Sequence, residues 1–199
     1  MKVAIIQYNA GNVQSVRYAL ERLGVHPILT DDHEEIMKAD KVIFPGVGNA
    51  ASAMEYLKQR QLDKLITSLK QPVLGICLGL QLLCSHSEEE DTPCLGIFDT
   101  RVCLFRNRNN FKKVNMKIPQ VGWNNIYDCT GDLFTGVADS YVYYVHSFYA
   151  ELCSHTISKT NYIIPYSAGL QKDNFFALQF HPEKSGSSGE QILSNFLAL

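Results

Sequence analysis

The 199-residue chain has little of several features that mark particular protein classes. Its six cysteines form no C-x-x-C pair and no paired Cys and His pattern, which argues against a disulfide framework or a zinc site. The longest apolar stretch, residues 73–84, is interrupted and far shorter than the ~20 residues that cross a bilayer. The net charge of only −2 gives no reason to expect nucleic acid or an anionic membrane as a partner. We therefore expect no metal, no cofactor, and no membrane or nucleic-acid partner.

The composition that remains is that of an ordinary globular protein. Hydrophobic residues make up 46% of the chain and charged residues 19%. Residues 1–199 suit one domain with a sizeable core. The opening "MKVAIIQYNAGN" has too short an apolar run for a secretory signal, so we expect a cytoplasmic protein with free thiols.

The first half of the chain alternates two hydrophobic periods. Short β-like runs predict strands, and runs with apolar residues three and four apart predict helices. The predicted strands are 2–6, 26–30, 41–46 and 72–76, and the predicted helices are 15–24, 31–39, 50–70 with a candidate break near Gln59–Gln61, and 78–87. Alternation with short links predicts right-handed βαβ units and a mainly parallel sheet. After residue 95, β-branched and aromatic runs predict further strands, some antiparallel, before a final helix at 189–199.

Cys77 stands out from the other cysteines because of its neighbours. The stretch "GICLG" has the form G-x-nucleophile-x-G between a predicted strand and a predicted helix. On such a turn, the helix N-terminus favours a thiolate and the N–H of Leu78 is free to bind an oxyanion. Taken alone, the motif fits equally a thiol that is simply packed in a buried strand.

Two more segments offer a general base and oxyanion donors for a nucleophile at Cys77. In "FHPEKS", His181 and Glu183 are one residue apart, so on an extended segment their side chains share a side. Glu183 can then orient His181 as a proton shuttle, although an isolated H-x-E is also typical of a surface histidine beside an acid. The glycine-rich "FPGVG" (44–48) offers backbone N–H groups for an oxyanion, and alone it is equally a tight turn. Together the three segments predict nucleophile, base, orienting acid and oxyanion loop at the ends of strands.

These motifs resemble a known family. "GICLGLQLL" with "FHPEKS" is similar to the class I (triad) glutamine amidotransferases. "PQVGWN" (119–124), "YVHSFY" (144–149) and "YNAGNVQSV" (8–16) narrow the likeness to the glutaminase subunits of imidazole glycerol phosphate synthases. The resemblance covers essentially the whole chain. It implies an α/β fold with a flavodoxin-like, open, mostly parallel sheet, helices on both faces and an added antiparallel portion.

The resemblance also implies an activity. Cys77 would attack the side-chain amide of glutamine and form a thioester. His181 would protonate the departing ammonia and then activate water, with Glu183 orienting it. The implied oxyanion donors are the N–H groups of Val47 and Leu78, and the implied substrate-binding residues are Gly48, Gln81, Glu89, Ser147 and Phe148. Phe148 stands where a tyrosine is common, so one hydroxyl contact to the substrate is missing, and Glu89 is placed only by its spacing from Cys77.

A partner subunit is implied as well. In the family, ammonia passes to a separate (β/α)8-barrel cyclase that makes imidazole glycerol phosphate. The positions that match its interface are Asn12, Gln120, Trp123, Tyr143 and Lys184. From the residues alone, Trp123 is either a core residue or an interface anchor. Before Gly11 and Asn12 the chain reads "QYNA" where the family has an Asp-Tyr-Gly motif, so any role of that acid is absent.

Other functions remain as alternatives. One is the glutaminase of another amidotransferase, such as that for pyridoxal phosphate or anthranilate synthesis, in which "PQVGWN" and "VHSFY" are not expected. A cysteine peptidase or a redox-stress protein of the same fold shares an elbow cysteine and a histidine, but Gln81 and the H-P-E segment favour chemistry on glutamine. An inactive scaffold is disfavoured because Cys77, His181 and Glu183 are all present.

Overall fold

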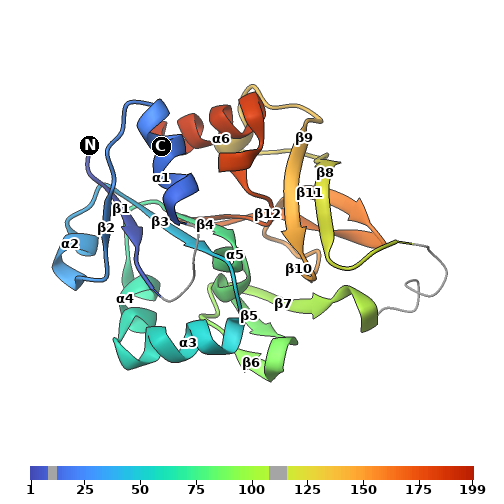
Figure 1. Cartoon of the computed structure of the whole chain (residues 1–199), viewed down its shortest axis with the longest axis horizontal. Coiled ribbons are helices and arrows are strands. Elements are labelled where there is room, and N and C mark those ends of the chain that lie inside the picture. The colour runs from blue at the N-terminus through green and yellow to red at the C-terminus, as the bar shows by residue number, and fades with distance from the viewer. Residues whose placement is uncertain (9–12, 108–115) are drawn as a thin grey trace.

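A mixed sheet forms the centre of the computed structural model, which describes residues 1–8, 13–107 and 116–199 (Figure 1). Five neighbouring strands of this sheet run parallel in the order β2-β1-β3-β4-β13. Their bounds are β1 Val3–Ile6, β2 Ile28–Thr30, β3 Lys41–Gly46, β4 Val73–Cys77 and β13 Phe175–Leu178. This is the flavodoxin-like strand order, so the predicted α/β fold is confirmed.

The sheet continues beyond β13 with mostly antiparallel pairs. The path runs β13-β12-β10-β7-β5-β6, with β11 paired to β12. These strands are β5 Cys84–Ser87, β6 Thr92–Pro93, β7 Phe98–Leu104, β10 Phe148–Ala150, β11 Thr156–Tyr162 and β12 Ile164–Lys172. A separate antiparallel pair is formed by β8 (Gln120–Asn125) and β9 (Tyr141–His146). The predicted antiparallel portion is therefore present as well.

Helices cover both faces of the parallel strands, as Figure 1 shows. Side chains alternate along a strand, so Ile5 and Ile43 join one core while Ala4 and Val42 join the other. The helices α1 (Val13–Arg22) and α6 (Gly186–Ala198) pack on the first core. The opposite core is covered by α2 His33–Met37, α3 Ala50–Gln59, α4 Leu62–Ser68 and α5 Leu78–Leu83.

The structure breaks one of the predicted helices and shortens another. The candidate break near Gln59–Gln61 is confirmed, because α3 ends at Gln59, α4 begins at Leu62, and Gln61 between them has a left-handed φ of 55°. The predicted helix over 78–87 is wrong in its second half, because α5 ends at Leu83 and Cys84–Ser87 forms β5. That tail consists of cysteine, serine and histidine, which are weak helix formers, and it gains hydrogen bonds by pairing with β6 and β7. Tertiary pairing therefore overrides the weak local preference.

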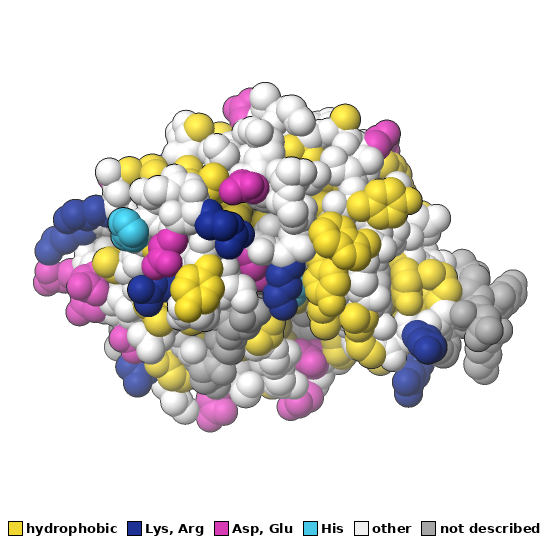
Figure 2. All heavy atoms as spheres, turned by 45° about the horizontal axis from the view of Figure 1, so that its top comes forward, with side chains coloured by type: hydrophobic (Ala, Val, Ile, Leu, Met, Phe, Trp, Pro, Cys, Tyr) yellow, Lys and Arg dark blue, Asp and Glu magenta, His cyan; other side chains and the backbone are white. Residues whose placement is uncertain are grey.

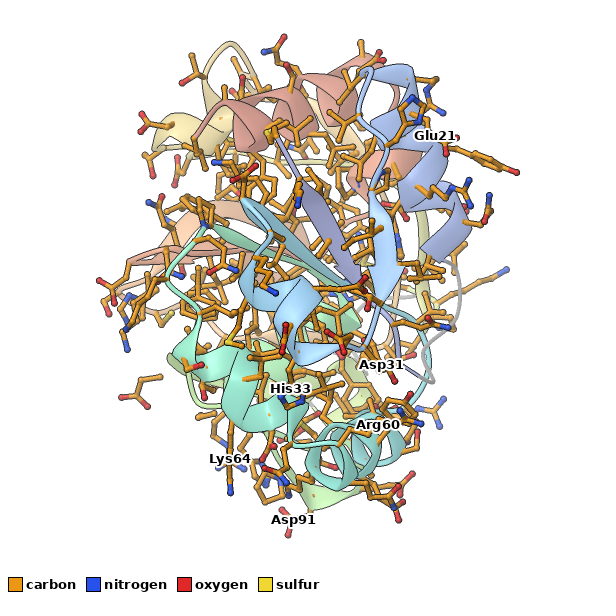
Figure 3. All side chains as sticks on the ribbon, turned by 90° about the vertical axis from the view of Figure 1, so that its left-hand side faces the viewer. Glu21, Asp31, His33, Arg60, Lys64 and Asp91 are labelled. Atoms are coloured by element: carbon orange, nitrogen blue, oxygen red, sulfur yellow. The ribbon has the colours of Figure 1, made fainter. Side chains whose placement is uncertain are left out.

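Polar contacts tie the outer helices together at the sheet's β2 edge (Figure 3). Arg60 follows α3 and lies 2.5 Å from the carboxylate of Asp31, the residue after β2. The ring of His33 lies 2.9 Å from the Arg60 carbonyl oxygen. Exposed ion pairs of this kind contribute at most about 1 kcal/mol, so the two apolar cores provide most of the stabilisation. Within the described ranges, no helix has the length and apolar character to cross a membrane.

Candidate active site

Three strand ends meet at the carboxyl edge of the parallel sheet. The register pairs Gly46 at the end of β3 with Cys77 at the end of β4. On the other side, Leu178 of β13 pairs with Ile76, which brings the segment after β13 level with Cys77. Cys77 therefore lies between the glycine-rich loop after β3 and the histidine segment after β13, at the edge where α/β sheets place their sites.

The backbone at Cys77 has an unusual conformation. Its φ of 55° and ψ of −107° lie outside the regions that side chains favour, and α5 begins at the next residue. The turn needs glycine beside it, since a Cβ at Gly79 would lie 1.8 Å from the Phe44 carbonyl oxygen and one at Gly75 would lie 3.0 Å from Gly79. The structure therefore contains the strained strand-to-helix turn that the G-x-C-x-G pattern predicts.

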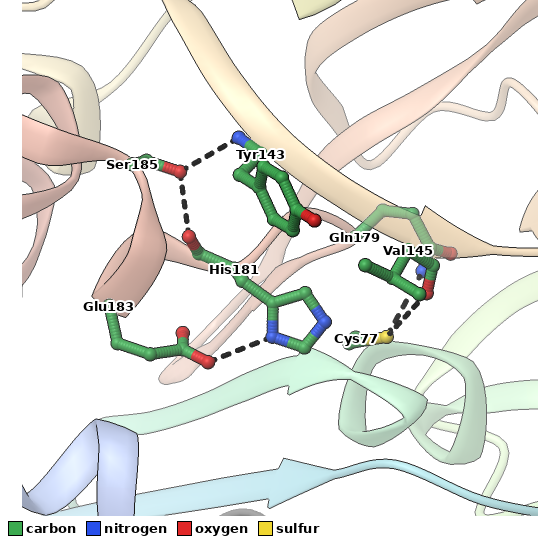
Figure 4. Close-up of polar contacts among 7 residues, drawn as sticks. All are labelled: Cys77, Tyr143, Val145, Gln179, His181, Glu183 and Ser185. Atoms are coloured by element: carbon green, nitrogen blue, oxygen red, sulfur yellow. Dashed lines mark hydrogen bonds and ion pairs between the residues drawn. The ribbon is translucent and has the colours of Figure 1, made fainter. Parts of the chain in front are cut away.

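His181 and Glu183 lie next to Cys77 and are held in place by the backbone (Figure 4). Nδ1 of His181 is 2.8 Å from Oε1 of Glu183, and their side chains are only 4% and 1% exposed. The N–H of His181 donates to the Tyr143 carbonyl. The hydroxyl of Ser185 donates to the His181 carbonyl and accepts from the N–H of Tyr143. These bonds fix the short 3-10 helix η5 (Pro182–Lys184) against β9.

The pKa of His181 is raised to about 10. Burial acts to lower it, but hydrogen bonds and electrostatic interactions with Cys77 and Glu183 outweigh the burial. The imidazole is therefore held protonated in the resting site, where the positive charge faces the sulfur on one side and the carboxylate on the other. Such a strongly perturbed histidine in a cleft is typical of a functional site.

A cavity of about 280 Å³ opens over Cys77 and His181. Most of the predicted site residues line it: Val47, Gly48, Cys77, Leu78, Gln81, Glu89, Ser147, Phe148, His181 and Lys184. Glu183 does not line this cavity but holds His181 from behind. The cavity has the size of a small-molecule site, so the sequence motifs converge on one place in the fold.

Two predicted substrate-binding residues are already held by protein groups. Oε2 of Glu89 accepts the N–H of Ala50, the first residue of α3, at 2.7 Å. Burial raises the pKa of Glu89, while the bond from Ala50 opposes that shift. The side-chain amide of Gln81 donates to the Phe148 carbonyl at 3.0 Å and to Gln179 at 3.2 Å. Both side chains therefore present a fixed orientation to the cavity.

Sequence reasoning missed three residues of the site: Val145 and Gln179, which lie beside the sulfur, and His146, which lines the cavity. The Cys77 thiol lies 3.8 Å from the Val145 carbonyl, and the Gln179 amide lies 3.8 Å from the same sulfur. His146 is buried beside the cavity, with Nδ1 2.7 Å from the Phe148 carbonyl. The Val145 carbonyl belongs to the backbone and has no sequence signal. Gln179 precedes the H-P-E motif by two residues and His146 lies inside "YVHSFY", so their position in or beside a motif was a signal that could have identified them.

Burial gives His146 a pH-dependent effect on stability. Its pKa is lowered to about 4, chiefly by burial, and the neighbouring His181 lowers it further. A histidine in the unfolded chain binds a proton below about pH 6.5, whereas His146 in the folded protein stays neutral down to about pH 4. Between these pH values, proton binding therefore favours the unfolded state. The stability associated with neutral His146 is present above pH 6.5 and is lost as the pH falls towards about 4.

We expect His146→Gln to remove this acid sensitivity. The wild-type free energy of unfolding should decrease as the pH falls. His146 should contribute up to about 1.4 kcal/mol per pH unit to this decrease between pH 6.5 and 4, and the variant should lack that contribution. Urea unfolding at a series of pH values measures it. The exposed His26→Gln controls for the loss of one histidine, and equal slopes in the wild type and His146→Gln would contradict the assignment.

The predicted interface residues do not all lie on one surface. Trp123 is 55% exposed and packs edge-on against Tyr143 across the β8–β9 pair, with ring centroids 5.9 Å apart. Figure 2 shows hydrophobic side chains gathered over these two strands, and Lys184 is exposed beside the cavity mouth. Gln120, by contrast, is buried and its side-chain oxygen accepts the Tyr166 hydroxyl, so it is not available on this surface. Asn12 lies outside the described residues.

No metal site accompanies this cavity in the part of the chain that the structure describes. Residues 1–8, 13–107 and 116–199 contain no group of three or more His, Cys, Asp or Glu side chains arranged to hold a metal ion. The six cysteines are free thiols. At the cavity, Cys77 supplies a sulfur nucleophile, with His181 and the carboxylate of Glu183 beside it.

Comparison with known proteins finds matches that cover nearly the whole chain. The family model of class-I glutamine amidotransferases matches residues 4–199. The chain is 55% identical over 200 residues to the imidazole glycerol phosphate synthase subunit HisH of Bacteroides fragilis (strain YCH46), covering all of both chains. It is 45% identical over 202 residues to the subunit of that name from Yersinia pseudotuberculosis, again covering all of both chains.

A solved structure has the same fold. A glutamine amidotransferase from Thermotoga maritima superposes with a TM-score of 0.65 at 17% sequence identity, covering 99% of this chain and 82% of the other. At that identity the likeness concerns the fold. The family model and the full-length relatives extend the likeness to the sequence itself, and the chain belongs to the class-I glutamine amidotransferase family.

Proposed function

We propose that this chain is the glutaminase subunit of an imidazole glycerol phosphate synthase. It would hydrolyse glutamine to glutamate and ammonia and pass the ammonia to a (β/α)8-barrel cyclase subunit in histidine biosynthesis. The observation that carries the proposal is the buried His181–Glu183 pair beside Cys77, in a chain that matches the named subunits over its full length. We further propose a single domain over residues 1–199 and a cytoplasmic location, where thiols stay reduced.

In the first step, the Cys77 sulfur attacks the side-chain carbonyl carbon of glutamine. A carbon–sulfur bond forms and the carbonyl oxygen becomes an oxyanion. The proposed donors to this oxygen are the N–H of Leu78, at the start of α5, and the N–H of Val47 in the loop after β3. One such donor is typically worth about 10²–10³ in rate, so the position of the loop can control turnover.

In the second step, the carbon–nitrogen bond breaks and ammonia leaves with the proton from His181. The thioester carries no charge on sulfur, so the contribution of Cys77 to the raised pKa of His181 is lost at this point. His181 then takes a proton from the water that attacks the thioester, and the carbon–sulfur bond breaks to release glutamate. Throughout, Glu183 holds Nδ1 and leaves Nε2 free to face the sulfur.

The cavity offers groups that suit the two ends of glutamine. The carboxylate of Glu89 fits the α-ammonium group, because opposite charges attract strongly at a half-buried site. Gln81, Gly48, Ser147 and Phe148 are proposed to contact the rest of the substrate from the cavity wall. Phe148 offers an aromatic face rather than a hydroxyl at its position.

The exposed aromatic face over β8 and β9 is the proposed cyclase contact. Its exposed apolar side chains are Val121, Trp123, Tyr141 and Val145, and Lys184 and Tyr143 lie at its margin. An exposed tryptophan flanked by tyrosines is typical of an interface anchor. Because Val145 and Lys184 also belong to the cavity wall, a partner on this face would cover the site from which ammonia leaves.

Glutamine turnover with and without the cyclase tests the proposal. We expect slow hydrolysis by the chain alone and strong stimulation when the barrel cyclase and its nucleotide ligand are added. The corresponding synthase subunits for pyridoxal phosphate and for anthranilate serve as matched controls and should not stimulate. Full turnover by the isolated chain, unchanged by the cyclase, would overturn the partner assignment, and stimulation by a control subunit would favour the alternative amidotransferases.

A further inference from the structure

We propose that Gln179 is a hydrogen-bond donor to the Cys77 sulfur and that Gln81 and the Phe148 carbonyl fix its orientation. The side-chain amide of Gln179 then stabilises the thiolate that attacks the substrate. This inference deepens the proposed function and rests on Cys77 being its nucleophile. It adds a residue that the triad pattern does not contain.

The position of Gln179 follows from strand pairing. β13 runs parallel to β4, and Leu178 pairs with Ile76, so Gln179 and Cys77 occupy the same level one residue beyond the pair. The N–H of Gln179 donates to the Ala168 carbonyl, which keeps the backbone attached to the neighbouring β12. The side chain is completely buried, and Nε2 lies 3.8 Å from the Cys77 sulfur (Figure 4).

A chain of hydrogen bonds determines which end of the Gln179 amide faces the sulfur. The Phe148 carbonyl can only accept, so the nitrogen of the Gln81 amide must face it, at 3.0 Å. The same nitrogen also donates to Gln179, at 3.2 Å, so the oxygen of Gln179 must face Gln81. The nitrogen of Gln179 is left on the side of Cys77, where it can only donate.

The Gln179 donor matters because the Val145 carbonyl, which also lies beside the sulfur, has the opposite effect on its protonation. The Val145 carbonyl lies 3.8 Å from the same sulfur and accepts a hydrogen bond from the thiol, which favours the protonated form. An N–H donor favours the negatively charged form, and in a buried site water competes with it only weakly. Gln179 therefore offsets the carbonyl, in addition to the positive charge on His181.

The rate of Cys77 alkylation by iodoacetamide measures the thiolate fraction directly. The rate is followed over a range of pH by mass spectrometry of the Cys77 peptide, which separates Cys77 from the other five cysteines. For Gln179→Met, we expect the pH of half-maximal rate to increase by about one unit, which is a tenfold slower reaction below it. The maximal rate at high pH should stay unchanged, because access to the sulfur is not altered.

Two further variants separate the donor from its orientation. Gln179→Asn shortens the side chain so that the amide no longer reaches the sulfur, and it should shift the profile as Gln179→Met does. Gln81→Met removes the group that orients Gln179, so we expect a smaller shift in the same direction. The exposed Gln191→Met is the matched control, with no shift. The titratable groups around the site are unchanged in every variant: Tyr8, Glu89, His146, His181, Glu183 and Lys184.

The outcomes distinguish this inference from the proposed function. Unshifted profiles in the folded Gln179→Met and Gln179→Asn proteins would overturn the donor role, even if Cys77 proves essential for glutamine hydrolysis. A shift with Gln179 variants and none with Gln81→Met would overturn the orienting role of Gln81. If Gln179→Met does not fold, Gln179→Asn and Gln81→Met decide the question. Shifted profiles in a protein that has no glutaminase activity even with the barrel cyclase and its ligand would support the donor role and reject the proposed function.

Discussion

Replacing Cys77 with alanine is expected to abolish glutamine-dependent synthesis by the complex, with a loss of at least about 10⁴-fold. The cyclase should still work at full rate when ammonia is supplied directly. The reason is that the sulfur forms the only covalent bond to the substrate in the proposed reaction. His181 and Glu183 cannot replace it, because they only move and hold a proton.

The fold should tolerate this change. Alanine has no more difficulty than cysteine with a φ of 55°, and Cys77 belongs to the apolar core on the α1 and α6 side. Cys129→Ala is a suitable control, because Cys129 is half-buried and lies outside the cavity lining. Loss of both the glutamine-dependent and the ammonia-dependent reaction in Cys77→Ala would mean that the cysteine is structural.

Gly79→Ala is expected to be strongly destabilising, by about 3 kcal/mol or more. The added Cβ would lie 1.8 Å from the carbonyl oxygen of Phe44, and the next nearest atom is that residue's backbone carbon at 3.0 Å. The backbone of a central strand is held by its hydrogen bonds and cannot relieve the clash by rotating as a side chain can. The helix α5 would therefore have to move away from β3. Because α5 begins at Leu78, this movement would also displace the turn that holds Cys77.

Urea unfolding of the variant measures the loss, with Gly136→Ala as the matched control. Gly136 has a φ of 75° and open space around its Cα, so alanine there costs only the strained backbone, about 1 kcal/mol. The difference between the two variants isolates the steric contact. A Gly79→Ala protein as stable as the wild type would show that α5 is not packed this closely on β3.

The elements that the sequence predicted well are those in which local signals agree with the tertiary structure. The alternation of short apolar runs and amphipathic helices specifies β1 to β4 with their helices, and G-x-C-x-G specifies the turn at Cys77, because only glycine fits against β3 at Gly79. His181 and Glu183 contact each other as predicted, although Pro182–Lys184 forms a 3-10 helix and not the expected extended segment. Their proximity to Cys77 follows from the rule that parallel strands bring their carboxyl ends together.

The parts that were missed depend on contacts between distant segments. β5 forms from a weakly helical sequence because β6 and β7 offer it partners. Gln179 is oriented toward Cys77 through Gln81, which lies 98 positions from Gln179 and 67 positions from Phe148 in the chain. The side chain of Gln120, a residue predicted at the partner interface, is directed inward to the Tyr166 hydroxyl. Side-chain direction of this kind is set by packing, for which a single sequence has no pattern.

The most direct test of the central claim is the mass of the chain caught during turnover. The complex is mixed with glutamine, quenched in acid within the first turnovers, and the intact mass of this chain is measured. We predict a species heavier by one glutamyl group, located on the Cys77 peptide and absent from Cys77→Ala. Steady turnover of glutamine by Cys77→Ala, or a glutamyl group attached to a different residue, would contradict the account.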